Sequence, residues 1–283
     1  MIMDSNQLNV DIKMALEKEK KLLKLLGSCE RALVAYSGGV DSSYLLYKAS
    51  LALGQDNVLA VTVQSELSPP EEIEEAAKNA LTMNIVHQVL KIDLLKIPGI
   101  VENSPERCYI CKNYIYKNLR GFAEESNYAV VLDGSNADDK DEYRPGLRAL
   151  KELGIKSPLV EAGLGKKEIR YLSKQAGLTT WDKPAAACLA SRLCYGDKIT
   201  PAKLELVARA EKYLRQLGVK DNIRVRYHGN LARIEVDEKD IELLVSNREL
   251  VVNKLGKLGF LYVTLDLSGF QSGSMDRMVR YND

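Results

Sequence analysis

The chain has 283 residues, of which 46% are hydrophobic and 28% charged, and its 40 basic against 39 acidic side chains give a formal net charge of +1. This composition is ordinary for a globular protein, which excludes a wholly disordered, collagen-like or coiled-coil chain. The near-zero charge provides no global basic field, which argues against nucleic acid as the main partner. At roughly 150 residues per domain, the length favours two domains.

The N-terminal sequence and the cysteines indicate a cytoplasmic protein without a membrane partner. The first residues lack a basic segment followed by an apolar run, and no stretch approaches the roughly 18 consecutive apolar residues of a membrane span. The five cysteines are odd in number and too few for a disulfide scaffold. They therefore favour a reducing compartment and a chemical use.

The first half of the chain alternates between helical and strand patterns. The expected helices are Leu8–Gly27, Asp41–Leu53, Pro70–Met83 and Tyr109–Ser126, and the expected strands are Arg31–Tyr36, Val58–Val63, Ile85–Leu90 and Ala129–Leu132. Short apolar strands that alternate with helices predict parallel βαβ units. We therefore expect an α/β fold with a doubly wound, mostly parallel sheet.

The pattern changes after about residue 197. The expected elements are helices Pro201–Leu217 and Lys239–Leu255, a hairpin of strands Ile223–Tyr227 and Ala232–Val236, and a strand Phe260–Leu267. This order predicts a smaller α+β domain over residues 198–283, after a larger domain over residues 1–197.

A glycine-rich turn, Ser37-Gly38-Gly39-Val40-Asp41-Ser42-Ser43, lies between the first strand and its helix. Its glycines permit a tight turn that presents backbone N–H groups beside the positive end of the helix. The serine hydroxyls add donors, and Asp41 is placed to orient Mg²⁺ or the loop itself. The turn therefore fits a pyrophosphate, although the Walker A pattern and its lysine are absent. For the SGG tripeptide alone, a plain turn with a Ser/Asp cap is the alternative.

A second polar segment, Asp133-Gly134-Ser135-Asn136-Ala137-Asp138-Asp139, follows the fourth strand. The carboxyl ends of strands in an open parallel sheet form its ligand-binding edge. Gly134 and Asp138 are therefore candidates for nucleotide binding. The alternative is a turn capped by Asn and Asp.

Three cysteines are candidates for sulfur or metal chemistry. Cys108 and Cys111 form a CxxC at the start of a helix, so both thiols can face one ion, while Cys188 lies in WDKPAAACLASR. Four interpretations remain open: a zinc site with Cys194 as the fourth ligand, a redox disulfide within the CxxC, a tri-thiolate [4Fe–4S] cluster with one open iron, or a nucleophilic Cys188 beside a structural CxxC. Unconnected buried thiols are the plain alternative. Cys29 is expected to be a small buried apolar residue.

The smaller domain contains two candidate binding features. Glu211 shares a helix face with apolar residues, where a carboxylate is costly unless it is paired or functional. In the hairpin, alternation places Arg224, Arg226, Arg233 and Glu235 on one face and apolar side chains on the other. Arginine forks suit phosphates and carboxylates. The alternatives are an exposed helix edge and a solvated sheet face with cross-strand ion pairs.

The SGGVDSS turn resembles the PP-loop of the ATP pyrophosphatase superfamily, whose members adenylate a carboxylate or carbonyl oxygen and release pyrophosphate. This resemblance implies Mg²⁺ and ATP as cofactors. It implies that the loop binds the pyrophosphate through Ser37, Gly38, Gly39, Asp41, Ser42 and Ser43.

The PP-loop, GSNADD and WDKPAAACLASR together resemble the larE family of ATP-dependent sulfur transferases, which helps to build the nickel-pincer nucleotide cofactor. The resemblance implies that ATP adenylates a carboxylate of pyridinium-3,5-biscarboxylate mononucleotide and that sulfur at Cys188 makes the thiocarboxylate. In some members this cysteine gives up its sulfur and becomes dehydroalanine, whereas members with a CxxC hold a [4Fe–4S] cluster. With Cys108, Cys111 and Cys188 as ligands, the chain resembles the cluster-bearing members, and Cys194 departs from that pattern.

The same resemblance implies substrate contacts at Ser191, Arg192, Glu211 and Arg224, a homo-oligomer and a sulfide donor. Catalytic roles fall on Cys188 and Asp41. Rival hypotheses are a tRNA thiolation enzyme, an amide-forming ligase of the NAD or GMP synthetase type, and a nucleotide-binding regulator or Fe–S sensor with a degenerate loop.

Overall fold

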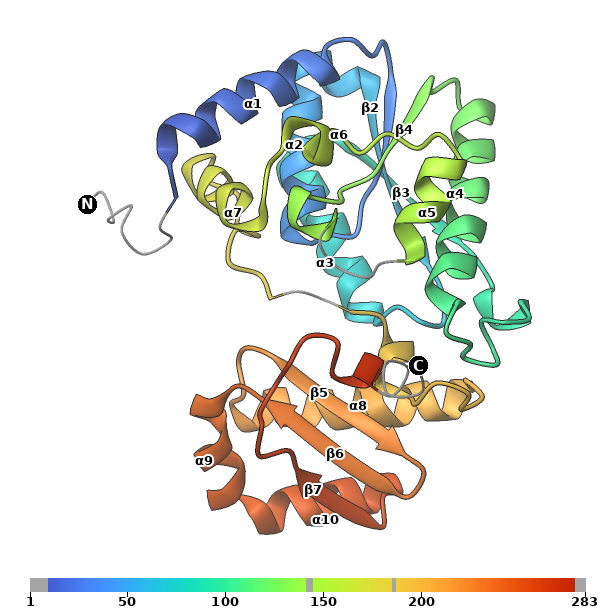
Figure 1. Ribbon diagram of the computed structural model, residues 1–283, viewed down its shortest axis with the longest axis vertical. Helices are drawn as coiled ribbons and strands as arrows, with labels where there is room; N and C mark the ends of the chain where they lie inside the picture. The colour runs from blue at the N-terminus through green and yellow to red at the C-terminus, as the bar shows by residue number, and fades with distance from the viewer. Residues whose placement is uncertain (1–9, 141–144, 185–186, 278–283) are drawn as a thin grey trace. The chain divides into compact units, whose positions relative to one another are not determined.

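The computed structural model describes residues 10–140, 145–184 and 187–277. They form two compact units (Figure 1). Unit 1 takes its described residues from Met1–Ser65, Pro70–Ile92 and Cys108–Lys183, and unit 2 from Glu66–Pro69, Asp93–Arg107 and Pro184–Asp283. Within the described ranges, no helix is both long and apolar enough to cross a membrane.

The sheet of unit 1 has four parallel strands in the order β3-β2-β1-β4. The strands are β1 (Ala32–Ala35), β2 (Val58–Gln64), β3 (Val86–Lys91) and β4 (Val130–Leu132). In the middle of the sheet, Val34 lies opposite Ala60 on β2 and Leu132 on β4. The predicted parallel α/β architecture is confirmed.

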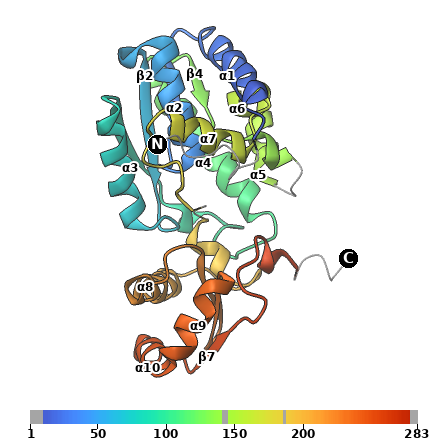
Figure 2. The ribbon, with the colours of Figure 1, turned by 90° about the vertical axis from the view of Figure 1, so that its left-hand side faces the viewer.

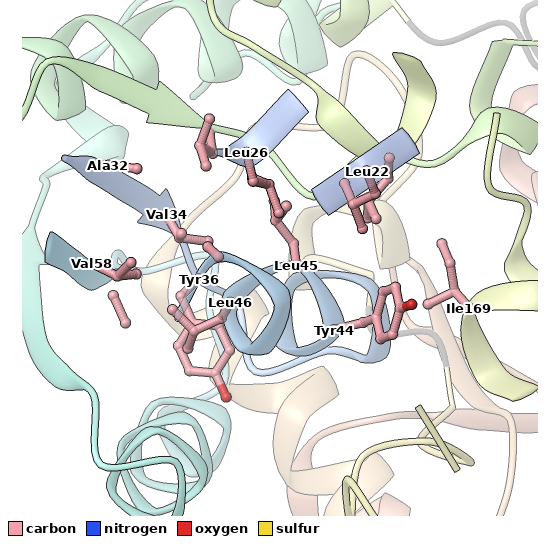
Figure 3. Packing of buried hydrophobic residues seen from close by; sticks show 14 of the residues in the cluster. Leu22, Leu26, Ala32, Val34, Tyr36, Tyr44, Leu45, Leu46, Val58 and Ile169 are labelled. Atoms are coloured by element: carbon pink, nitrogen blue, oxygen red, sulfur yellow. The ribbon is translucent and has the colours of Figure 1, made fainter. Parts of the chain in front are cut away.

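Helices cover both faces of this sheet, which explains why β1 and β2 are apolar on both sides. One buried cluster joins Val34 to helices α1 (Ile12–Leu26), α2 (Val40–Leu53), α3 (Pro70–Thr82), α6 (Pro158–Ala162) and α7 (Lys166–Gln175) (Figure 3). Leu33 points the other way, into a cluster with α4 (Arg107–Glu125) and α5 (Pro145–Glu152). The sequence pattern predicted no elements for the stretch that forms α5, α6 and α7.

Unit 2 contains a three-stranded sheet of β5 (Ile223–His228), β6 (Leu231–Val236) and β7 (Tyr262–Leu265). Strands β5 and β6 form the predicted antiparallel hairpin, and β7 runs parallel to β6. Its apolar face packs against α8 (Pro201–Leu217), α9 (Glu238–Ser246) and α10 (Arg248–Leu258) (Figure 2).

Two local predictions were wrong, and one lies outside the described residues. The expected helix Lys239–Leu255 is two helices that meet at Asn247, whose side chain donates to the Leu243 carbonyl at 2.8 Å and so competes with the helical backbone. Cys29 is half-buried rather than buried in the core. The expected start of the first helix at Leu8 precedes the first described residue.

The packing of α2 sets a first prediction. Leu46 is fully buried between the helix and the sheet, whereas Leu51, on the same helix, is 58% exposed. Leu46→Ala should lower the free energy of unfolding by about 2–5 kcal/mol, because it removes buried methyl groups and leaves a cavity. Leu51→Ala should change it by less than about 0.5 kcal/mol in the same urea titration. Equal effects of the two substitutions would contradict the packing described for α2.

Candidate functional site

The two polar loops predicted at the sheet edge meet in unit 1. Strands β1 and β4 are neighbours, and the strand order reverses beside β1, so their carboxyl ends open at the topological switch point. Asn136, after β4, donates from Nδ2 to Asp41 Oδ2 at 3.3 Å. A Cβ at Gly134 would lie only 3.1 Å from the backbone of Ser42, so a glycine is needed where the loops approach.

The loop after β1 is ordered by its own hydroxyl groups. Ser42 Oγ donates to the Gly39 carbonyl at 3.2 Å and accepts from the Ser37 amide at 3.3 Å. Helix α2 begins at Val40, directly after the turn, so the positive end of its dipole lies at the loop. Gly38 has a φ of +69° and sits against Ala76, which leaves no room for a side chain. The result is a concave set of donors suited to an anion.

A lysine that sequence reasoning did not find lies on the same loop. Lys166, at the start of α7, places Nζ 2.6 Å from Asp41 Oδ2, and its amide donates to Asp138 Oδ2 at 2.8 Å. The other carboxylate oxygen of Asp41, Oδ1, is buried and has no hydrogen-bond partner within the described residues. Burial raises the pKa of the Asp41 carboxyl, and the charge of Lys166 opposes that shift. Asp41 therefore has one oxygen available for a cation.

A second lysine reaches the loop from the C-terminal end of unit 1. Lys183 Nζ donates to the Gly38 carbonyl at 3.1 Å and pairs with Glu75 at 3.0 Å. Lys166 and Lys183 thus bring two positive charges to a loop whose sequence contains none. The sequence carries no pattern that marks Lys166 as a site residue, because its contact with Asp41 joins residues 125 positions apart.

In unit 2, the residues around Cys188 form a loop held through its backbone. Cys188 is exposed and precedes a short 3₁₀ turn, η5 (Leu189–Arg192). Its carbonyl accepts from Ser191 Oγ at 2.8 Å and from Arg192 Nη1 at 3.1 Å. Arg192 Nη1 also donates to the Ala187 carbonyl at 2.6 Å. The main chain is fixed while the thiol faces outwards.

Arg192 is in turn held by Glu211 on α8. Arg192 Nε and Nη2 each donate to one carboxylate oxygen of Glu211 at 2.8 Å, and both side chains are more than nine-tenths buried. Glu211 Oε1 also accepts from the Val225 amide on β5 at 3.0 Å. The alternative of an exposed helix edge is therefore wrong. This carboxylate is buried because a planar guanidinium and a backbone amide satisfy it.

Most of the cationic face of the hairpin is also buried, so it is not a solvated face, although the cross-strand ion pairs of that alternative are present. Glu235 on β6 has no exposed surface and pairs with Arg226 at 2.7 Å and Arg233 at 3.0 Å. Arg226 also donates to the Ser191 carbonyl at 3.0 Å, which links the hairpin to the Cys188 loop. Burial, with the nearby charge of Arg192, lowers the pKa of Arg224 to about 10.

Unit 2 therefore brings together four of the predicted substrate residues, Ser191, Arg192, Glu211 and Arg224, with Cys188. Arg226 and Glu235, which the sequence placed on the candidate binding face of the hairpin, belong to the same network. The alternating charges of the hairpin were the signal for them.

The remaining thiols are distributed over both units. Cys108 and Cys111 lie one turn apart in the first turns of α4 in unit 1, and Cys188 and Cys194 lie in unit 2. The five cysteines are all within the described residues, and none forms a disulfide. Over residues 10–140, 145–184 and 187–277, no group of three or more His, Cys, Asp or Glu side chains is placed to hold a metal ion.

Comparison with known proteins places the chain in a family. It is 44% identical to an uncharacterized protein of Synechocystis over 93% of this chain and 98% of that protein. It is 42% identical to the pyridinium-3,5-bisthiocarboxylic acid mononucleotide synthase of Lactiplantibacillus plantarum, over 92% of this chain and 94% of the synthase. The chain belongs to the family of this synthase.

Two further similarities cover only parts of the chain. A family model described as NAD synthase matches residues 18–120, the segment that contains the loop after β1. A glutamine-hydrolyzing GMP synthase component of Thermoplasma acidophilum is 33% identical over 64% of this chain and 62% of that protein. The nucleotide loop thus belongs to the wider PP-loop superfamily, as its sequence predicted.

The buried ion pair gives a second prediction. Glu211→Gln should lower the free energy of unfolding by about 3–5 kcal/mol, because it leaves the buried Arg192 guanidinium without its counter-charge. Glu205→Gln, on the same helix, removes a 69% exposed partner of Arg209 and should cost less than about 1 kcal/mol. Chemical denaturation of both variants measures the difference. If Glu211→Gln lowered the free energy of unfolding no more than Glu205→Gln does, the Arg192–Glu211 pair would not be what holds the Cys188 loop.

Proposed function

We propose that this protein is an ATP-dependent, AMP-forming sulfur transferase that converts a carboxylate of pyridinium-3,5-biscarboxylate mononucleotide into a thiocarboxylate. The observation that carries the proposal is the 42% identity to a relative named as the bisthiocarboxylic acid mononucleotide synthase, over nearly the full length of both chains. The loop at Asp41 and the loop at Cys188 supply residues suited to the two half-reactions, adenylation and sulfur transfer.

The loop after β1 fits Mg²⁺ and ATP. The buried Asp41 Oδ1 lacks a hydrogen-bond partner among the described residues, and carboxylate oxygens are the ligands that Mg²⁺ prefers. Asp41 would hold the ion, and Ser37, Gly39, Ser42 and Ser43 would surround the pyrophosphate at the positive end of α2. When bound, the cation would neutralise charge on the phosphates.

In the adenylation step, an oxygen of the substrate carboxylate attacks the α-phosphorus of ATP. A P–O bond forms, the bond to the β-phosphate oxygen breaks, and pyrophosphate leaves with the electron pair. Lys166 and Lys183 place positive charge beside the loop that would receive this leaving group. Fixed charges of this kind stabilise the leaving group without reorganisation during the reaction.

In the transfer step, Cys188 supplies the sulfur nucleophile. Its thiolate attacks the acyl carbon and AMP leaves, which gives a thioester. Loss of the Cα proton and cleavage of the Cβ–S bond then give the thiocarboxylate and a dehydroalanine at position 188. Ser191 and Arg192 hold the backbone of this loop, so that the exposed thiol is presented at a fixed point.

As an alternative to this sacrificial route, we propose that Cys108, Cys111 and Cys188 are ligands of a [4Fe–4S] cluster. Thiolates are the usual ligands of such a cluster, and the first two thiols lie one turn apart at the start of α4, although the described residues do not gather three ligating side chains at one place. When bound, the cluster would supply sulfide from its fourth iron and spare the cysteine. An external sulfide donor would then restore it.

The role of Cys188 gives a third prediction. Cys188→Ser should abolish thiocarboxylate formation but leave pyrophosphate release from ATP in the presence of the mononucleotide, because adenylation does not use the thiol. Mass spectrometry of the product and a pyrophosphate assay measure the two steps. Cys29→Ser, at a half-buried thiol in unit 1, is the matched control and should change neither.

The partial similarity to a GMP synthase component supports a second candidate, an amide-forming ligase. In that case ammonia rather than sulfur would displace AMP. Full turnover of Cys188→Ser with ammonia would then favour the ligase and contradict the sulfur transferase.

The cluster gives a fourth prediction. Anaerobically purified protein should contain about four iron and four sulfide per chain, with the broad visible absorption of an Fe–S cluster. Cys108→Ser should remove both signals, because the variant lacks one thiolate ligand, and Cys29→Ser should keep them. A colourless protein with about one zinc per chain would support a zinc site instead.

A further inference from the structure

Unit 2 contains a cavity of about 190 Å³ beside the polar face of its sheet. Side chains that can bind an anion dominate its lining: His228, Arg233, Gln271, Ser274 and Arg277, with the carboxylate of Asp266. Small-molecule sites usually measure about 300–1,000 Å³, so this cavity is too small for a whole mononucleotide. It is large enough for one of its charged groups.

One wall of the cavity contains an imidazole that contacts a thiol. Cys194 Sγ lies 3.2 Å from His228 Nδ1 and 3.7 Å from the Tyr227 carbonyl. Burial and the charge of Arg233 lower the pKa of His228, which favours the neutral ring. His228 Nε2 is buried and has no hydrogen-bond partner in the described part of the chain.

A second wall contributes another unsatisfied donor. Arg233 Nη2 donates to Glu235 Oε1 at 3.0 Å, but its Nε is buried and has no hydrogen-bond partner within the described residues. Asp266 Oδ2 is 3.7 Å from this Nε, and Asp266 Oδ1 accepts from the Ser268 amide at 2.9 Å. Buried N–H groups without acceptors are costly, so these two donors favour an acceptor group in the cavity.

The charged side chains that line the cavity favour an anion. Arg233 and Arg277 contribute two positive charges and Asp266 one negative charge. Among the described residues, the exposed Arg277 side chain donates to Gln271, a neutral partner that does not offset the charge of the guanidinium. Ser274 Oγ donates to Glu235 and accepts from Arg226, which joins the cavity to the Arg226–Ser191 contact beside Cys188.

We infer that this cavity binds the phosphate group of the mononucleotide substrate, which rests on the proposed function. Arg233 and Arg277 would form charge-assisted hydrogen bonds with the phosphate oxygens, and the buried Nε2 of His228 would face the same group. The cavity would fix one end of the substrate while the pyridinium carboxylate reacts elsewhere. Cys194, which the sulfur chemistry leaves without a role, would act here by positioning the His228 ring.

The test compares the mononucleotide with its dephosphorylated nucleoside. Isothermal titration of the full chain should show that Arg277→Gln weakens binding of pyridinium-3,5-biscarboxylate mononucleotide by about tenfold or more and leaves binding of the nucleoside unchanged. Arg277 is exposed, so the variant should fold. Arg248→Gln, at an exposed arginine on α10, is the control and should alter neither affinity. Equal weakening of both ligands, or of neither, would overturn the inference.

Titration with inorganic phosphate alone separates this inference from the proposed function. If the wild-type chain binds phosphate and Arg277→Gln does not, the cavity is an anion site. If the wild-type chain binds phosphate but neither the mononucleotide nor the nucleoside, the anion site is supported and the proposed substrate is wrong. Absence of phosphate binding together with unchanged mononucleotide binding in Arg277→Gln would reject the cavity assignment itself.

Discussion

The paired hydrogen bonds between Arg192 and Glu211 organise unit 2 around the loop of Cys188. Glu211 comes from α8 and also accepts from the amide of Val225 on β5, so one carboxylate joins a helix, a strand and the Cys188 loop. Replacing such a buried pair by apolar residues often costs little stability, but removing one partner costs a great deal. The Arg192–Glu211 pair therefore serves to position the loop rather than to stabilise the fold. Its planar guanidinium fixes the direction of the backbone after Cys188.

A different constraint governs the nucleotide site of unit 1. Parallel pairing of β1 and β4 places two loops, separated by about ninety residues in the chain, at one edge of the sheet. Gly134 then lies against Ser42, and Asn136 reaches Asp41. The topology thus creates the site, and the local sequences only supply its donors.

Much of this organisation was predictable because its signals are local. The glycines and serines of the PP-loop are adjacent in the chain, and the strict alternation of Arg224 with Val225 and Arg226 is enough to define the two faces of the hairpin. Lys166 was missed because it reaches Asp41 across 125 residues, and a single lysine near a helix start has no distinguishing pattern. The burial of Glu235 was equally hidden, since alternation assigns a face but not what covers it. Asn247 divided a helix because a local side-chain hydrogen bond outweighed a continuous apolar pattern.

The backbone anchoring of Cys188 has a consequence for the fate of the molecule after reaction. The hydrogen bonds that hold residue 188 are made by its carbonyl oxygen, with Ser191 and Arg192 as donors, and the thiol faces outwards. On the proposed sacrificial route, loss of the sulfur atom would leave these backbone hydrogen bonds among the described residues in place. A chain that had lost its sulfur would then remain folded, and its disposal or repair would have to depend on recognition of residue 188 itself.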